Sequence, residues 1–290
     1  MTVAPTTFRS DIAFAGQLAC ILEVTAPKPG NVSPGRDFAD LTYEDFLLSA
    51  AAIGGALGEA GTCSPGETVL RAIRETRRWV RTNTNLGIVL LFAPLARAAA
   101  IRGGSLRSRL SAVLSTLTVE DAVAVYEAIR LADPGGLGEV SEHDVRGVPE
   151  ITLGEAMALA ADRDAIAREY VTDFAITFEV AVPVVEMARA QGASWSEAAL
   201  EAYLHLLSRV PDTLIARKKG FAAARRVSEH ADRVLRSGRP GSPARQAAID
   251  AFDALLRDPS HSLNPGTTAD LTAAALFVVL LDQIPGRLER

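Results

Sequence analysis

The sequence predicts an all-α protein, and two observations support this fold class. Apolar residues recur at helical spacing through most of the 290 residues, whereas alternating strand-like runs are hard to find. Hydrophobic residues make up 48% of the chain and charged residues 22%, which is enough apolar surface for a substantial core. We therefore expect a single globular multi-helix domain over residues 1–290, with its polar loops converging on one pocket.

Helices are expected over most of the chain, and several have recognisable start signals. Thr42 precedes YEDF and Thr118 precedes VEDA, so each has a capping hydroxyl and a carboxylate in the first turn. Pro94 should kink or divide its helix because proline lacks the backbone N–H. The expected helices are 8–24, 42–61, 66–81, 86–101, 106–116, 118–132, 152–161, 163–190, 195–209, 221–237, 243–256 and 267–283.

Composition excludes several classes of protein. The net charge of −5 argues against a general nucleic-acid binder, which needs a basic surface. Two cysteines without a CxxC pair make a disulfide framework or a thiolate zinc site improbable and suit a reducing cytoplasm. The N-terminus lacks the pattern of a signal peptide, and Asp282 interrupts the most apolar stretch, so we expect a cytoplasmic protein without a membrane partner.

The motifs of several common enzyme folds are missing from the sequence. It contains no GxxxxGK[ST], no GxGxxG after a strand, no GxSxG elbow and no HExxH. These absences disfavour a P-loop ATPase, a Rossmann dehydrogenase, an α/β-hydrolase and a zincin.

Five polar segments interrupt the helical pattern, and we expect them to meet at one end of the helix bundle. Loops on a rigid scaffold carry function more often than helices do. The segments are PKPGNVSPGRDF at 27–38, TNTNLG at 82–87, DPGGLGEVSEHDVRGVPE at 133–150, PDTLIARKKG at 211–220 and HSLNPGTTAD at 261–270.

The first segment combines a restricted backbone with groups that bind anions or metals. Three prolines and two glycines preorganise it, which lowers the ordering cost when a ligand binds. Lys28 offers a point charge for phosphate, Asn31 a neutral donor, and Asp37 an oxygen ligand for Mg²⁺ or a partner for Arg36. The alternative for this segment is a connector between helices whose charges face solvent.

Two further segments offer weaker signals. Asn83 and Asn85 precede an apolar helix. Thr84 or Asn85 would cap this helix, or the two Asn amides would bind an anion together with its free N–H groups. Asp144 follows His143 in the long loop and is a candidate metal ligand or general base, although a solvated, salt-bridged loop explains it equally well.

The last two segments suit a phosphate with its Mg²⁺. Arg217 can form a bidentate contact to phosphate and Lys218 can neutralise another, unless both simply favour a helix C-terminus. In the NPGTTAD stretch, Thr267 or Thr268 begins a helix and Asp270 lies in its first turn, so amides, hydroxyls and a carboxylate gather at one helix end. A simple capping box is the alternative there.

In this order, the segments resemble the triphosphoribosyl-dephospho-CoA synthase family over about residues 16–283. The stretches that carry the resemblance are EVTAPKPGNVSPGRDF, TNTNLG, VRGVPEITLGEA, PDTLIARK and NPGTTADLTAAALFV. The resemblance implies an all-α, nucleotide-dependent transferase that converts ATP and 3′-dephospho-CoA into a triphosphoribosylated product with release of adenine. It also implies Mg²⁺, ATP as a substrate, and a small-molecule rather than a nucleic-acid partner, and it leaves homo-oligomerisation open.

The resemblance also implies roles for individual residues. It implies catalytic roles for Asp37, Asp144 and Asp270, metal ligation by Asp37 and Asp270, and nucleotide binding by Lys28, Asn31, Asn83, Asn85, Arg217, Lys218, Asn264, Thr267 and Thr268. Which carboxylate acts as the base stays open.

Departures from the family pattern keep other functions open. Asn85 and Leu86 stand where the family usually has His and Lys, and a histidine and an Asp-Met pair that usually follow PKPG are missing. The chain is thus more similar to a divergent branch from methanogens and methylotrophs. Its alternatives are an enzyme or a silent binding protein for a methanopterin- or methanofuran-type one-carbon coenzyme, and last a purely structural scaffold.

Overall fold

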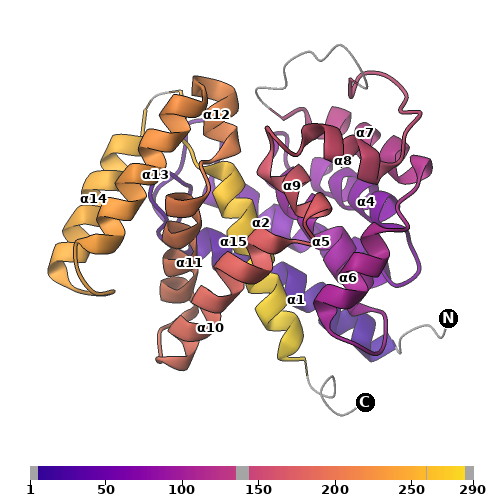
Figure 1. Cartoon of the computed structure of the whole chain (residues 1–290), viewed down its shortest axis with the longest axis horizontal. Coiled ribbons are helices and arrows are strands. Elements are labelled where there is room, and N and C mark those ends of the chain that lie inside the picture. Colours follow the sequence, from indigo (N-terminus) through magenta and orange to yellow (C-terminus); the bar gives the residue numbers. More distant parts are fainter. Residues whose placement is uncertain (1–5, 135–143, 259, 285–290) are drawn as a thin grey trace.

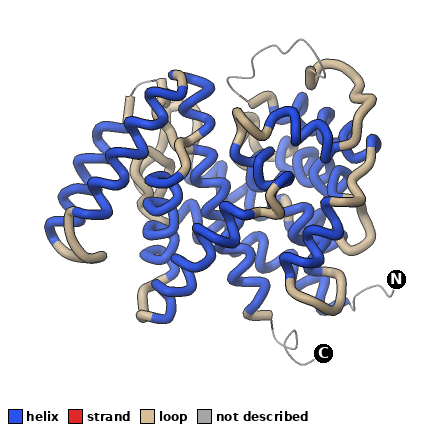
Figure 2. Tube along the Cα trace, in the orientation of Figure 1, coloured by secondary structure: helices blue, strands red, loops and turns tan. Residues whose placement is uncertain are grey.

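The computed structural model describes residues 6–134, 144–258 and 260–284, and this part of the chain is helical without any strand (Figure 2). Short turns and loops join the helices, and a single isolated β-bridge pairs Ser33 with Arg36 in the first polar segment. The predicted all-α fold class is confirmed. The expectation of a single domain stays a prediction.

Helix α15 (Gly266–Asp282) lies in the middle of the fold (Figure 1). It is apolar on nearly every side, and fourteen of its seventeen residues are buried, as expected for a helix surrounded by others. It packs against α1 (Thr6–Thr25), α5 (Leu86–Ala99), α10 (Val182–Ala190), α11 (Trp195–Arg209) and the short π-helix η1 (Ile176–Ala181).

One group of helices lies to the right of α15 in Figure 1 and shares a large apolar core with it. The strongest packing within this group is between α4 and α7, and α8 packs on α9. Besides α5, the group contains α4 (Pro65–Arg77), α6 (Leu106–Leu114), α7 (Val119–Ala132), α8 (Leu153–Ala160) and α9 (Ala165–Val171), while α2 (Tyr43–Ala52) and α3 (Gly54–Glu59) pack on α1.

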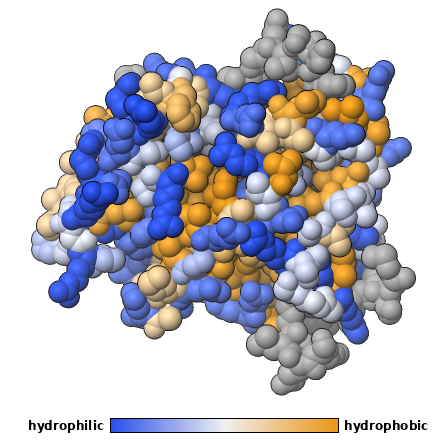
Figure 3. Space-filling model, viewed as in Figure 1, coloured by the Kyte–Doolittle hydropathy of each residue, from blue (hydrophilic) through white to orange (hydrophobic). Residues whose placement is uncertain are grey.

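A second group lies to the left of α15 and has its own apolar cluster (Figure 1). It is formed by α11, α12 (Thr213–Lys219), α13 (Phe221–Arg236) and α14 (Pro243–Leu256). The space-filling view shows mainly hydrophilic residues over this outer group and hydrophobic residues in the middle of the same face, between the two groups (Figure 3).

Two expected helices were wrong. The segment 42–61 divides into α2 and α3, and 163–190 divides into α9, η1 and α10. The second break follows Asp173 and Phe174, whose φ angles of 50° and 57° are left-handed and end α9. The polar segment 211–220 contains α12, which has Asp212 as its capping residue and basic residues in its last turn, so the structure shows the helix C-terminus that was the alternative for this segment.

Helix α5 runs through Pro94 without a break, contrary to a division there. Proline cannot donate to the carbonyl four residues earlier, which belongs to Leu90. The hydroxyl of Tyr170 donates to that carbonyl oxygen at 2.7 Å, so the orphaned acceptor is satisfied by α9.

Among the described residues, the model contains no helix with the combination of length and apolar character required to span a bilayer.

Candidate active site

All five polar segments contribute to the wall of one cavity of about 890 Å³. It opens between α12 of the second helix group and α7, α8 and α9 of the first, beside the N-termini of α5 and α15. The expected convergence of the polar segments is therefore confirmed. The residues that they contribute include Asn31, Asp40, Thr82, Asn83, Thr84, Asn85, Leu86, Gly87, Asp133, Asp144, Leu214, Arg217, Lys218, Asn264, Gly266, Thr267 and Asp270, with Asp40 just beyond the first segment.

Most of the predicted site residues lie in this wall. They are Asn31, Asn83, Asn85, Asp144, Arg217, Lys218, Asn264, Thr267 and Asp270. Three others do not. The Asp37 carboxylate accepts from the backbone N–H of Tyr43 at 2.7 Å at the start of α2, and Thr268 donates to Asp212 from its N–H and its hydroxyl, each at 2.8 Å.

Lys28 is the third predicted residue outside the wall. It is 1% exposed, and its ammonium group contacts the Glu23 carboxylate at 2.9 Å. It also donates to the backbone carbonyls of Glu23 and of Ala26, the latter at 3.2 Å. These contacts occupy the three N–H donors of a lysine, so Lys28 serves the protein rather than a phosphate.

The first segment is held rigidly against the second helix group. Gly30 N–H donates to the Asp253 carboxylate at 2.8 Å, and the Asn31 amide donates to the Tyr203 hydroxyl at 2.8 Å. Gly30 has a φ of 74°, and a Cβ there would lie 2.8 Å from that of Leu256, so both its conformation and its packing require glycine. The segment is thus a fixed part of the cavity wall.

The start of α5 faces the cavity next to a carboxylate from α15. The Asn83 side chain accepts from Leu86 N–H, the first of α5, at 3.1 Å. Asn85 is the N-cap residue, but its amide donates to the Thr76 hydroxyl at 3.0 Å instead of capping the helix. The Asp270 carboxylate lies directly on the backbone of Gly87, where an added Cβ would be 2.0 Å from Oδ2. Only glycine at position 87 leaves room for this approach.

Two aspartates join the helices on the other side of the cavity. Asp212 accepts from Leu214 N–H at 2.9 Å and Ile215 N–H at 3.0 Å, in addition to Thr268, and therefore connects the starts of α12 and α15. Asp164 caps α9 and pairs with Arg217 at 3.2 Å. This network fixes the three helix starts relative to one another and holds Arg217 in the cavity wall.

The described part of the cavity wall carries more acids than bases. Its acidic residues are Glu23, Asp40, Asp133, Asp144, Asp164 and Asp270, and its basic residues are Arg81, Arg163, Arg217 and Lys218. Burial, followed by the negative charges of Glu23, Asp212 and Asp164, raises the pKa of Asp270 well above its usual range. Burial and the neighbouring Arg217 lower the pKa of Lys218. Such perturbed groups in a cleft are typical of functional sites.

Another part of the wall is apolar. Helices α7 and α8 contribute Val125, Tyr126, Ile129, Ala132, Leu153, Ala156, Met157, Leu159 and Ala160, called here the α7–α8 wall. A ligand in this cavity therefore meets Arg217, Lys218 and two helix N-termini, called here the charged end, as well as the aliphatic and aromatic side chains of the α7–α8 wall. This division suits a molecule with a polyphosphate and a less polar portion.

Sequence reasoning missed several residues of the wall. Glu23 lies in the stretch EVTAPKPG, but it was assigned no role because it belongs to the end of an expected apolar helix. Asp164 had a signal, since it precedes AIAREY as a capping residue does. The residues of the α7–α8 wall had no such signal in the sequence, because the apolar face of a helix has the same sequence pattern whether it lines a cavity or packs in a core. In the loop 133–150, residues 135–143, His143 among them, lie outside the described residues.

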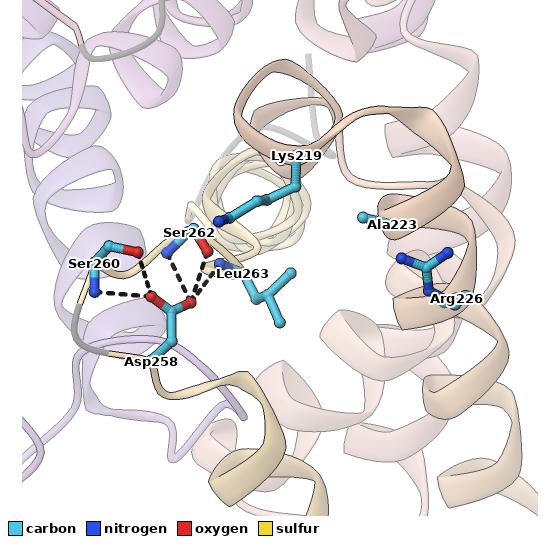
Figure 4. Close-up of a pocket in the computed structure, with 7 residues that line it drawn as sticks. All are labelled: Lys219, Ala223, Arg226, Asp258, Ser260, Ser262 and Leu263. Carbon is cyan, nitrogen blue, oxygen red and sulfur yellow. Dashed lines mark hydrogen bonds between the residues drawn. The ribbon is translucent and has the colours of Figure 1, made fainter.

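A second hollow, of about 470 Å³, lies beside α12 and α13 (Figure 4). Its acid, Asp258, is occupied, because Ser260 and Ser262 each donate to it from the backbone N–H and the hydroxyl. Burial raises the pKa of Asp258, but the four hydrogen bonds outweigh this effect, so the pKa lies below its usual range. Lys219 and Arg226 are exposed, so this hollow is a poorer candidate for catalysis.

Comparison with known proteins identifies a matching protein family and several relatives of this chain. The model of the ATP:dephospho-CoA triphosphoribosyl transferase family matches residues 9–287. A protein of Albidiferax ferrireducens, named a probable 2-(5″-triphosphoribosyl)-3′-dephosphocoenzyme-A synthase, is 30% identical over 284 residues, which cover 91% of this chain and 87% of the relative. The synthase of that name from Klebsiella pneumoniae is 34% identical over 107 residues, 37% of this chain and 36% of the relative.

A solved structure agrees with these relatives. A crystal structure from Archaeoglobus fulgidus, provisionally titled a triphosphoribosyl-dephospho-CoA synthase, superposes with a TM-score of 0.64 at 29% identity. The match covers 82% of this chain and 99% of that one. These relatives give no support to the alternative in one-carbon coenzyme chemistry.

Proposed function

Because the chain belongs to the ATP:dephospho-CoA triphosphoribosyl transferase family, we propose that it transfers the triphosphoribosyl group of ATP to 3′-dephospho-CoA. A hydroxyl of the acceptor forms a bond to ribose C1′, the bond from C1′ to N9 breaks, and adenine leaves with the electron pair. The observation that carries the proposal is that all five polar segments meet at one cavity whose wall has both charged and apolar side chains.

The charged end suits the triphosphate. Arg217 and Lys218 approach it from α12, and the N-termini of α5 and α15 add backbone N–H groups and the positive ends of two helix dipoles. Asn264 also lines the cavity, and its buried carboxamide oxygen accepts no hydrogen bond from the described residues. These groups support binding of a nucleotide in a fixed orientation.

The excess of acids in the wall suits a nucleotide that arrives with Mg²⁺. No three His, Cys, Asp or Glu side chains form a metal cluster within the described residues. Magnesium, however, is commonly bound by one or two carboxylates together with substrate phosphates, and Asp270 is placed for this role. The described wall has four basic and six acidic side chains, so its own charges do not compensate those of a triphosphate. A bound magnesium ion would neutralise part of the triphosphate charge.

The remaining wall has roles in the substitution itself. Charge develops on the ribose ring as the bond to adenine breaks, and carboxylates held at fixed positions stabilise such a state. The α7–α8 wall offers a dry surface for the adenine ring or for the aliphatic arm of the acceptor. A cytoplasmic place of action fits the two free, buried cysteines.

The proposal is tested by incubating the protein with ATP, Mg²⁺ and 3′-dephospho-CoA and following the products by chromatography with mass detection. We expect free adenine and the triphosphoribosylated acceptor in equal amounts. Omission of the acceptor should abolish adenine release, which separates transfer from simple nucleotide hydrolysis. Protein that is folded by circular dichroism and yields neither product would refute the proposal.

A further inference from the structure

Glu23 is a buried carboxylate in the cavity wall to which neither the family comparison nor the polar segments assign a role. It lies near the C-terminal end of α1 and is only 3% exposed, yet it lines the cavity. One of its oxygens, Oε1, contacts the Lys28 ammonium at 2.9 Å. The other, Oε2, accepts no hydrogen bond from the described residues, so it is left to the cavity.

The ion pair with Lys28 is not explained by a need for stability. Burying two charges costs desolvation that their attraction often fails to repay, and a hydrophobic pair commonly packs as well. The pair also joins residues only five positions apart, so it connects no distant elements. By contrast, the buried pair of Glu201 and Arg245, at 2.8 Å, joins α11 to α14.

Lys28 is itself held so that it acts on Glu23. Its remaining donors bind two carbonyls of the same stretch, and the stretch that follows is anchored to α11 through Asn31 and to α14 through Gly30. The rigid PKPG segment therefore fixes the position of a cation behind the carboxylate. Burial raises the pKa of Glu23 and Lys28 opposes this, as suits a carboxylate that must be ionised yet basic.

We propose that Glu23 is the catalytic carboxylate that accepts the proton of the attacking hydroxyl, and that Lys28 is the positioning residue that aims it. As the oxygen of the acceptor bonds to C1′, its proton passes to Glu23 Oε2, while the electron pair of the C1′–N9 bond leaves with adenine. The proton then returns to solvent or to the departing base, so the carboxylate is regenerated. This inference rests on the proposed function.

The test compares Glu23→Gln with wild type in the adenine-release assay. Glutamine keeps the shape of the side chain but is a far poorer proton acceptor, so we expect kcat to fall by about 10²- to 10⁴-fold. The Kd of ATP should change by less than about threefold, since Arg217, Lys218 and the helix N-termini that are proposed to bind the triphosphate are unchanged. Glu201→Gln is the matched control, because it neutralises another buried acid–base pair outside the cavity wall and should keep wild-type kcat.

The role of Lys28 is tested by coupling. Lys28→Met should lower kcat by about tenfold or more in the wild-type background, yet cause no further loss when Glu23 is already glutamine. A residue that only stabilises the fold would instead lower activity by the same factor in both backgrounds. Additive losses would therefore overturn the positioning role.

The outcomes separate this inference from the proposed function. Wild-type protein that releases no adenine overturns both, whereas an active wild type with an equally active Glu23→Gln overturns only the role of Glu23. Should Glu23→Gln fail to fold, Glu23→Asp keeps the charge beside Lys28 and withdraws the carboxylate by one methylene. That variant should bind ATP normally and lose about 10²-fold in kcat, and unchanged turnover would refute the inference.

Discussion

Replacing Gly87 with alanine adds one methyl group at the point where α5 meets the Asp270 carboxylate. The new Cβ would lie 2.0 Å from Oδ2, whereas ordinary contact begins at 3.4 Å, so the carboxylate must retreat by about 1.4 Å. Ile166 Cδ1, at 2.7 Å from the same point, restricts the directions available to the methyl group. If Asp270 holds the nucleotide-bound metal, a displacement of this size should lower kcat/KM by about 100-fold.

The effect on stability should be much smaller than the effect on turnover. Alanine is favoured over glycine in a helix by about 1 kcal/mol, and overpacking costs about 1–3 kcal/mol, so the free energy of unfolding should fall by only about 0–2 kcal/mol. Adenine release and urea unfolding measure the two effects separately. Gly55→Ala in α3 is the control, because its Cβ meets no atom within 4 Å and should leave activity unchanged. Full activity of Gly87→Ala would refute the placement of Asp270 at the reacting end of the cavity.

Three further predictions follow from the same contacts. Gly30→Ala should reduce the free energy of unfolding by about 2–4 kcal/mol, because the φ of residue 30 is 74° and Leu256 Cβ lies 2.8 Å from the added carbon. Urea unfolding measures this loss, and a variant as stable as the wild type would contradict the prediction. Arg217→Gln should raise the Kd of ATP by about 10- to 100-fold, which isothermal titration calorimetry measures. The same change should alter the free energy of unfolding by less than about 1 kcal/mol, since the ion pair of Arg217 with Asp164 is partly exposed. An unchanged Kd would count against a phosphate contact. Burial raises the pKa of Glu169 from 4.5 to about 7, so between these pH values the folded state retains a proton that the unfolded chain releases. The free energy of unfolding should therefore fall by at most about 3 kcal/mol between pH 4.5 and 7. Glu169→Gln should remove this part of the pH dependence, and identical pH profiles of the variant and the wild type would contradict the prediction.

The helices and their starts were accessible from the sequence, because each depends on residues within a turn or two of chain. The expected caps at Thr42 and Thr118 are both present as capping boxes, with Asp45 and Asp121 as the reciprocal partners. Where local reasoning failed, a distant group had changed the outcome. Pro94 does not end α5, because Tyr170 satisfies the carbonyl that proline leaves without a donor.

The site was only partly accessible for the same reason. Polar breaks in an apolar helical pattern indicated which five segments carry function, and all five do line the cavity. The sequence could not indicate which side chain in a break faces the ligand. Lys28 looked like a phosphate contact but lies buried against Glu23, a residue that looked like part of an ordinary helix.

The sequence by itself thus determined the all-α class, most helix boundaries to within a few residues and the segments of the site, since helical spacing and breakers act locally. Only the tertiary structure decided that Asp270 lies on Gly87, that Asp212 connects α12 to α15, and that α7 and α8 supply an apolar wall. These contacts join residues that are tens to hundreds of positions apart. Their geometry follows from how whole helices pack around α15, which no local pattern encodes.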